Sequence, residues 1–103
     1  HLPGVQNPNI TGQPSGVSVA AGATATFTVT AESIDDGTLS YQWQKAVGGG
    51  TFANISGANS ASYQTAATVA GDDGTLYRCL VTNTKGGLSV TTSTVAAMLT
   101  VAG

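Results

Sequence analysis

The feature that most constrains the fold is a strict alternation of apolar and hydroxylated side chains over residues 23–31. Ala25, Phe27 and Val29 fall on one parity, and threonines occupy the positions between them. Because successive side chains of a strand point to opposite sides, this period of two predicts a half-buried strand. Threonine and valine also lose rotamer freedom in a helix, so helical structure is disfavoured here.

Similar short runs recur along the chain, separated by turns rich in glycine, proline and asparagine. The other expected strands lie at residues 9–11, 17–20, 39–45, 52–55, 61–65, 76–83 and 88–101. Residues 66–74 are expected to form a corner that allows a helical turn. Seven or eight short strands with turns at this spacing predict an all-β, antiparallel sandwich or barrel.

Length and charge limit the partners of the chain. The 103 residues fit one domain, which we expect at residues 9–103, with residues 1–8 as a linker or domain junction. Residues 1–10 lack the charged start and apolar stretch of a signal peptide, so we expect a fragment of a longer chain. The three cations form no cluster, and no apolar run approaches about 20 residues. We therefore expect neighbouring domains as partners, no nucleic acid and no membrane insertion.

Two later segments carry a more specific pattern. Trp43 lies in the third strand, and Asp73, Tyr77 and Cys79 form an Asp-x-x-x-Tyr-x-Cys motif leading into the sixth. This ordered set resembles the immunoglobulin pattern of a core tryptophan followed by that motif. With the flanking strand segments, the resemblance covers nearly the whole chain from Pro8 onward, and it is to the bacterial and phage branch of I-set-like domains.

The resemblance implies an immunoglobulin-like, two-sheet Greek-key sandwich. It also implies that the Tyr77 hydroxyl bonds to backbone near the corner and that Asp73 caps the amides there. Parity and the resemblance together predict a structural core of Phe27, Val29, Tyr41, Trp43, Tyr63, Tyr77, Cys79 and Leu99.

The chain departs from the family pattern in two places. Val29 stands at the strand-B cysteine position, so the inter-sheet disulfide is absent and Cys79 has no internal partner. The return over residues 87–97 is longer than usual, which predicts a bulge or an extended hairpin.

Catalytic and metal sites are not expected. An inward Cys79 has neither the exposure nor the cation of a reactive thiol. His1 is the only histidine, so no Ser-His-acid triad or zinc site can be assembled. The acidic pairs at residues 35–36 and 72–73 are expected at opposite ends of the sandwich, too far apart for calcium. We therefore expect neither an enzyme nor a cofactor.

The resemblance implies a non-catalytic module of a bacterial secreted or cell-surface protein that acts as a spacer, docking or weak adhesion domain. A virion decoration or tail domain at the virion surface and a carbohydrate-binding accessory module of an enzyme are the alternatives. Any partner beyond neighbouring domains would be a cell-surface glycan or protein, and the isolated domain should be monomeric. Phe52 is the one aromatic residue expected to be exposed. Binding is expected at the loops over residues 32–38 and 83–88, through Glu32, Asp35, Asp36, Thr84 and Lys85.

Overall fold

The structure is a computed structural model that describes residues 5–102, so residues 1–4 of the predicted linker lie outside the described residues. Its elements are short strands and a single 3₁₀ turn, η1, at Ala70–Asp72. The strands are Asn9–Gly12 (β1), Val17–Ala20 (β2), Thr26–Thr28 (β3), Thr30–Glu32 (β4), Thr38–Ala46 (β5), Ala53–Asn54 (β6), Ser62–Gln64 (β7), Leu76–Lys85 (β8), Leu88–Ser93 (β9) and Ala97–Ala102 (β10).

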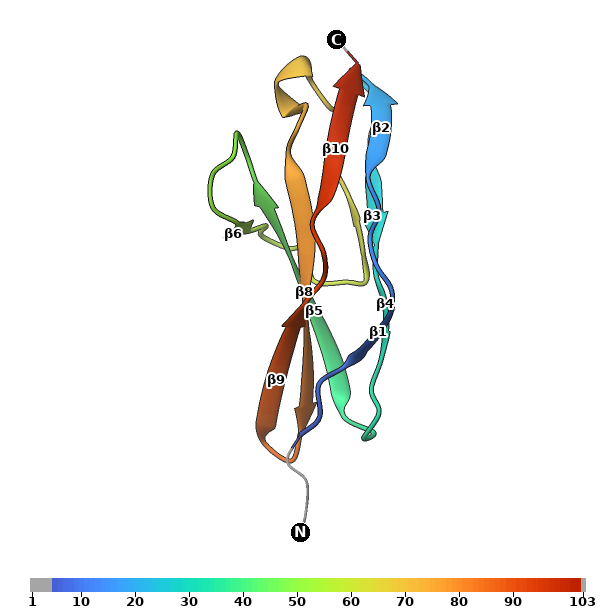
Figure 1. Cartoon of the computed structure of the whole chain (residues 1–103), viewed down its shortest axis with the longest axis vertical. Coiled ribbons are helices and arrows are strands. Elements are labelled where there is room, and N and C mark those ends of the chain that lie inside the picture. Colours follow the sequence, from blue (N-terminus) through green and yellow to red (C-terminus); the bar gives the residue numbers. More distant parts are fainter. Residues whose placement is uncertain (1–4, 103) are drawn as a thin grey trace.

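The strands form two layers (Figure 1). One layer has the order β2-β10-β8-β5-β6, and β9 continues along β8. In the other layer β1 pairs with β4, and β3 pairs with β7. All pairings are antiparallel except that of β2 with β10. The predicted all-β sandwich is therefore confirmed.

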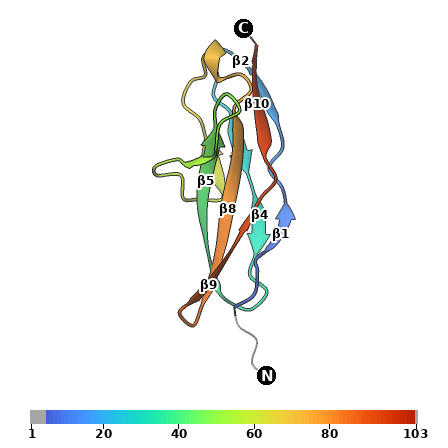
Figure 2. The same ribbon diagram turned by 60° about the vertical axis from the view of Figure 1, so that its left-hand side comes forward.

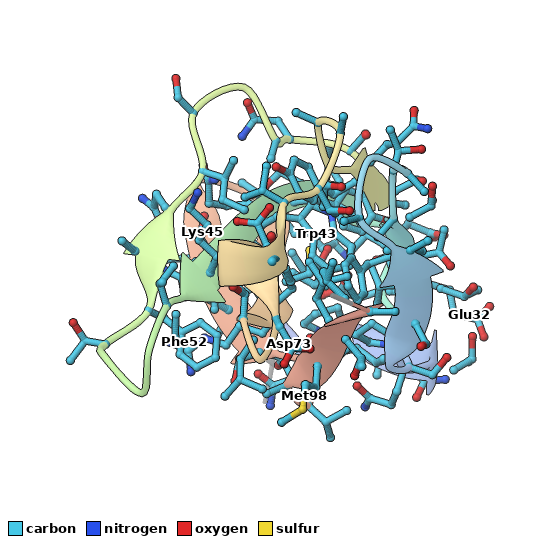
Figure 3. The ribbon with its side chains drawn as sticks, turned by 90° about the horizontal axis from the view of Figure 1, so that it is seen from above. Glu32, Trp43, Lys45, Phe52, Asp73 and Met98 are labelled. Atoms are coloured by element: carbon cyan, nitrogen blue, oxygen red, sulfur yellow. The ribbon has the colours of Figure 1, made fainter. Side chains whose placement is uncertain are left out.

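The core lies between the layers, where the period of two places one side of each strand inward. Trp43 is completely buried and lies centrally in Figure 3, and its Nε1–H donates to the Ser60 carbonyl at 2.7 Å. Phe27 stacks on Tyr77 with 4.7 Å between ring centroids. Six of the eight predicted core residues are buried: Phe27, Val29, Trp43, Tyr77, Cys79 and Leu99. Tyr41 and Tyr63 are partly buried and pack against this cluster.

The strand predicted over residues 23–31 is divided at Val29, which corrects the prediction of one continuous element. The reason is a change of neighbour, because β3 pairs with β7 whereas β4 pairs with β1. Val29 stays buried, and its N–H donates to the Ala61 carbonyl at 2.9 Å. The alternation of buried and exposed residues therefore continues across Val29.

The last predicted strand is divided by a bulge between β9 and β10. Leu80 pairs with Ser93, and Tyr77 pairs with Ala97. The step is three residues along β8 but four residues along the returning chain, which therefore holds one extra residue. Thr94 fills this step, because its N–H donates to the Cys79 carbonyl and its Oγ1 accepts the Cys79 N–H, both at 2.9 Å. The expected bulge in an extended hairpin is confirmed.

Two details predicted for the corner are wrong. Asp72, not Asp73, caps the η1 turn, since its Oδ2 accepts the Val69 N–H at 3.0 Å. Asp73 instead fixes β10, because its Oδ1 accepts the Val101 N–H at 2.8 Å. Within residues 5–102 the Tyr77 hydroxyl forms no hydrogen bond to the corner, and burial raises the pKa of Tyr77 to about 12.

The domain is long and narrow, with extents of 56 × 22 × 20 Å. The described chain starts at the end that holds the β4–β5 loop and the β8–β9 turn, whereas β10 finishes at the opposite end (Figure 1). The view in Figure 2 shows the same arrangement. The chain therefore enters and leaves the domain at opposite ends of its long axis.

Candidate functional site

The end at which the chain enters holds the five residues predicted to bind. Asp35 and Asp36 lie in the β4–β5 loop, and Asp36 adopts a left-handed backbone with φ of 62°. Glu32, Thr84 and Lys85 lie in strands rather than in loops, at the ends of β4 and β8. Glu32 lies on the opposite side of the domain from Phe52 (Figure 3).

The loop predicted over residues 83–88 is reduced to a two-residue turn. Gly86 and Gly87 both have positive φ, at 60° and 81°, which closes a hairpin without further residues. Strand pairing therefore continues to Lys85 and Leu88. Thr84 is occupied in this ladder, since its Oγ1 lies 3.0 Å from the Ser89 hydroxyl.

Asp35 is the centre of a polar network at this end. Its Oδ1 accepts hydrogen bonds from Asn83 Nδ2 at 2.8 Å, from the Ser33 hydroxyl at 2.8 Å and from the Gly37 N–H at 3.0 Å. Its Oδ2 accepts the Gln6 N–H at 2.8 Å. These donors, Asn83 foremost, hold the pKa of the Asp35 carboxyl well below its usual range. The carboxylate thus joins three segments and is not free for a ligand.

Asn83 completes the network from the inner side of β8. Its side chain is fully buried, and Nδ2 donates to the Gln6 carbonyl at 2.9 Å as well as to Asp35. Its Oδ1 has no hydrogen-bond partner. Gly37 packs so closely that a Cβ there would collide with this oxygen. We name the linked groups of Gln6, Asp35, Gly37 and Asn83 the entry clamp.

The structural role of Asn83 was not predicted from the sequence. A signal was present, because Asn83 shares the parity of Tyr77, Cys79 and Val81, which are all buried. A polar residue at an inward position needs hydrogen-bond partners, so it points to an internal network.

The entry clamp makes the stability of the folded domain depend on pH. Because the pKa of Asp35 is lowered in the folded state, its carboxylate stabilises the fold above the ordinary pKa of 3.8. This stabilisation is lost as the pH falls below that value. We expect Asp35→Asn to lower the melting temperature at pH 7. Between pH 5 and pH 2.5 the melting temperature of this variant should fall less than that of the wild type. Thermal unfolding followed by circular dichroism measures this.

Asp36→Asn is the matched control, because Asp36 is an exposed neighbour that the network does not use. This variant should keep the acid sensitivity of the wild type. An equal loss of melting temperature on acidification in the wild type and Asp35→Asn would contradict the role of Asp35.

The outer side of the long sheet carries a second group of side chains. The Arg78 guanidinium lies over the Phe52 ring at 4.1 Å from its centroid, and Arg78 Nε donates to Gln44 Oε1 at 2.9 Å. Gln44 Nε2 in turn donates to Asn54 Oδ1 at 2.8 Å. Phe52, predicted to be exposed, is therefore only partly exposed, with one ring face covered by Arg78.

Cys79 is the one thiol of the chain, and it is buried. Burial raises the pKa of the Cys79 thiol to about 11, so it stays protonated near neutral pH. No group of three or more histidine, cysteine or acidic side chains within residues 5–102 is placed to hold a metal ion. Among these residues there is also no helix long and apolar enough to cross a membrane.

Comparison with solved structures identifies proteins of similar fold. A chimeric titin Z1Z2 functionalized with a KLER exogenous peptide from decorin is similar over 96% of this chain and 97% of that one, with 20% identity and a TM-score of 0.53. Sidekick-1 immunoglobulin domains 1-5 match 91% of this chain with 24% identity and a TM-score of 0.54. This chain spans 19% of that protein. The likeness concerns the fold, and it confirms the predicted immunoglobulin-like sandwich.

Sequence comparison gives a family. No curated protein matches the chain. One family profile matches residues 10–102, which is almost all of the folded domain. The chain belongs to that family, described as Domain of unknown function (DUF8696).

Proposed function

We propose that the chain is a non-catalytic immunoglobulin-like module that spaces and docks parts of a longer bacterial secreted or cell-surface protein. The observation that carries this proposal is the path of the chain. It enters and leaves at opposite ends of a domain with extents of 56 × 22 × 20 Å (Figure 1). A module of this kind adds length between its neighbours, whereas one with adjacent ends would project to the side.

The entry clamp supports the spacer role. Gln6 lies before the first strand, and both its N–H and its carbonyl are held, by Asp35 and Asn83. The backbone that leads into the domain is thereby fixed to the β4–β5 loop and to β8. A fixed approach limits the directions that a preceding segment can take.

The placement of reactive groups supports a non-catalytic role. The Cys79 thiol is buried and protonated, and the Asp35 carboxylate is fully engaged by hydrogen bonds. Asp72 and Asp73 are bonded to backbone N–H groups near the far end of the domain. Among residues 5–102, the Cys79 thiol and these three carboxylates therefore do not converge on a common point.

Sugar binding is less well supported than docking. A sugar platform needs a free aromatic face, and one face of the Phe52 ring is covered by Arg78. The amide groups nearby are also engaged, as Gln44 is by Arg78 and Asn54.

A retention experiment tests the proposed function. The purified domain, shown to be folded by circular dichroism, is passed over insoluble and soluble polysaccharides and over whole bacterial cells, with Phe52→Ala as the matched variant. We expect the wild type and the variant to pass unretained over every polysaccharide. Saturable retention on one purified polysaccharide, lost in Phe52→Ala, would replace the proposal with a carbohydrate-binding module. Retention on cells alone would replace the spacer with an adhesion or virion role.

A further inference from the structure

Arg78 is held in place on the outer side of the long sheet. It is the one arginine of the chain. The guanidinium lies over the Phe52 ring, 4.1 Å from its centroid, and Gln44 Oε1 accepts the hydrogen bond of Nε. Two independent contacts therefore fix the orientation of the guanidinium, which lowers the entropy lost when it binds an acceptor.

The charge of Arg78 is not neutralised. Within residues 5–102 its two Nη atoms donate no hydrogen bond, and no carboxylate forms an ion pair with it. The side chain is only partly exposed. A fixed guanidinium in a partly desolvated position binds a carboxylate more strongly than a fully hydrated one does, through two parallel N–H···O bonds.

Apolar side chains share this outer face with Arg78 and its partner Gln44. Leu76 and Leu80 flank Arg78 on β8, at alternate positions to the buried Tyr77 and Cys79. Met98 on β10 pairs with Leu76 and is 50% exposed. Figure 3 shows Phe52 and Met98 on the side of the sheet away from Trp43. Leucine alone is common on surfaces, but arginine, methionine and aromatic residues together are enriched in protein interfaces.

We propose that this outer face, formed by Phe52, Leu76, Arg78, Leu80 and Met98, docks a protein partner that presents a carboxylate flanked by apolar side chains. The partner is acidic because Arg78 is the one charge among these five side chains. It is a protein rather than a polysaccharide because Arg78 covers one face of the Phe52 ring. The other apolar members of this outer face, Leu76, Leu80 and Met98, have no ring on which a sugar could stack. This inference deepens the docking part of the proposed function and rests on it.

Nitrogen-15 NMR of the arginine side chain tests the proposal, since a single arginine gives a single Nε–H resonance. The probes are acetyl-Leu-Glu-Leu-amide and its glutamine counterpart, acetyl-Leu-Gln-Leu-amide. We expect the acidic peptide to shift the Arg78 resonance with saturation at millimolar concentration and the neutral peptide to bind about tenfold more weakly. Equal shifts with both peptides, or no saturable shift, would overturn the proposal.

Two variants distinguish binding at Arg78 from non-specific attraction between the acidic peptide and positive charge on the domain. Arg78→Gln should abolish saturable shifts of the backbone amides near residue 78, and its amide spectrum reports whether the domain is still folded. Lys45→Gln is the matched control, because it removes an equal charge at an exposed position of β5 that alternates with Gln44; it should leave binding unchanged. If Lys45→Gln weakens binding as much, the attraction is non-specific and the proposal fails. If Arg78→Gln does not fold, the comparison of the two peptides on the wild type decides.

A titration with an acidic polysaccharide distinguishes a carboxylate on a protein from a carboxylate on a sugar chain. Polygalacturonate presents carboxylates on a sugar chain, and we expect it to shift Arg78 less than the acidic peptide does. A stronger response to polygalacturonate would overturn the choice of a protein partner. A domain that is not retained on polysaccharides or cells, and whose Arg78 does not respond to the peptides, would disprove this inference alone and leave the spacer role intact.

Discussion

Replacing Trp43 with alanine is expected to lower the free energy of unfolding by about 3–5 kcal/mol. The ring is completely buried between the sheets, so its removal leaves a cavity that the surrounding strands can fill only in part. The hydrogen bond from Nε1 to the Ser60 carbonyl is lost as well. Because small domains have only about 5–15 kcal/mol of stability in total, the variant should be close to unfolded at ambient temperature.

Urea unfolding followed by far-ultraviolet circular dichroism measures this effect, because the chain has no other tryptophan to report by fluorescence. Trp43→Phe keeps most of the ring volume and should lose less stability. Val47→Ala, at an exposed position, should leave the unfolding midpoint within experimental error of the wild type. A soluble Trp43→Ala domain with an unchanged midpoint would show that Trp43 is not a core residue.

The predictable part of the fold depends on local pattern. Phe27 and Val29, or Tyr77 and Cys79, are two residues apart, and two residues is the repeat of a strand. Such parity is visible without knowing the neighbouring strand. It located the core and most strand positions, and the long return over residues 87–97 indicated the bulge that Thr94 fills.

The errors arise where a partner is distant in the sequence. The division at Val29 follows from β3 and β4 pairing with different strands, which parity cannot indicate. Asp72 and Asp73 are adjacent and chemically equal, so only the position of Val101 relative to the corner decides which of them fixes β10. The entry clamp likewise needs Gln6, Asp35 and Asn83 to meet, 29 and 48 residues apart.

The candidate sites likewise depend on partners that are distant in the sequence. Asp35 was chosen as a binding residue because it lies in a loop, but its acceptors are consumed by the clamp. A single cation such as Arg78 forms no sequence pattern that would predict a binding residue. What distinguishes it in the structure is the contact with Phe52, 26 positions earlier, and the absence of a carboxylate partner within residues 5–102.

Asn83→Asp is an isosteric change that is expected to destabilise the domain strongly. The new carboxyl would be fully buried beside Asp35 Oδ1, at the position from which Nδ2 now donates over 2.8 Å. Two donated hydrogen bonds are lost, and two like charges face each other. Leaving a buried charge without a partner typically costs about 3–5 kcal/mol, and we expect a loss of this size at neutral pH.

The pH dependence of Asn83→Asp gives its signature. Burial and the charge of Asp35 raise the folded-state pKa of the new carboxyl above the unfolded value of about 3.9. The folded variant therefore binds a proton more readily than the unfolded one, so its stability deficit is largest at high pH and shrinks as the pH falls. A protonated carboxyl can also donate to Asp35, which restores part of the clamp. Urea unfolding at pH 7.5 and pH 4.5, compared with the wild type, should show this narrowing.

Asn83→Ala separates the charge from the lost hydrogen bonds. It removes both Nδ2 donations to Gln6 and Asp35 but places no charge in the core. Its deficit relative to the wild type should therefore be nearly the same at pH 7.5 and pH 4.5. If the deficit of Asn83→Asp were also independent of pH, the new carboxyl would be reaching solvent. Asn83 would then not be enclosed beneath Gly37, and Gln6 would not be held between the β4–β5 loop and β8.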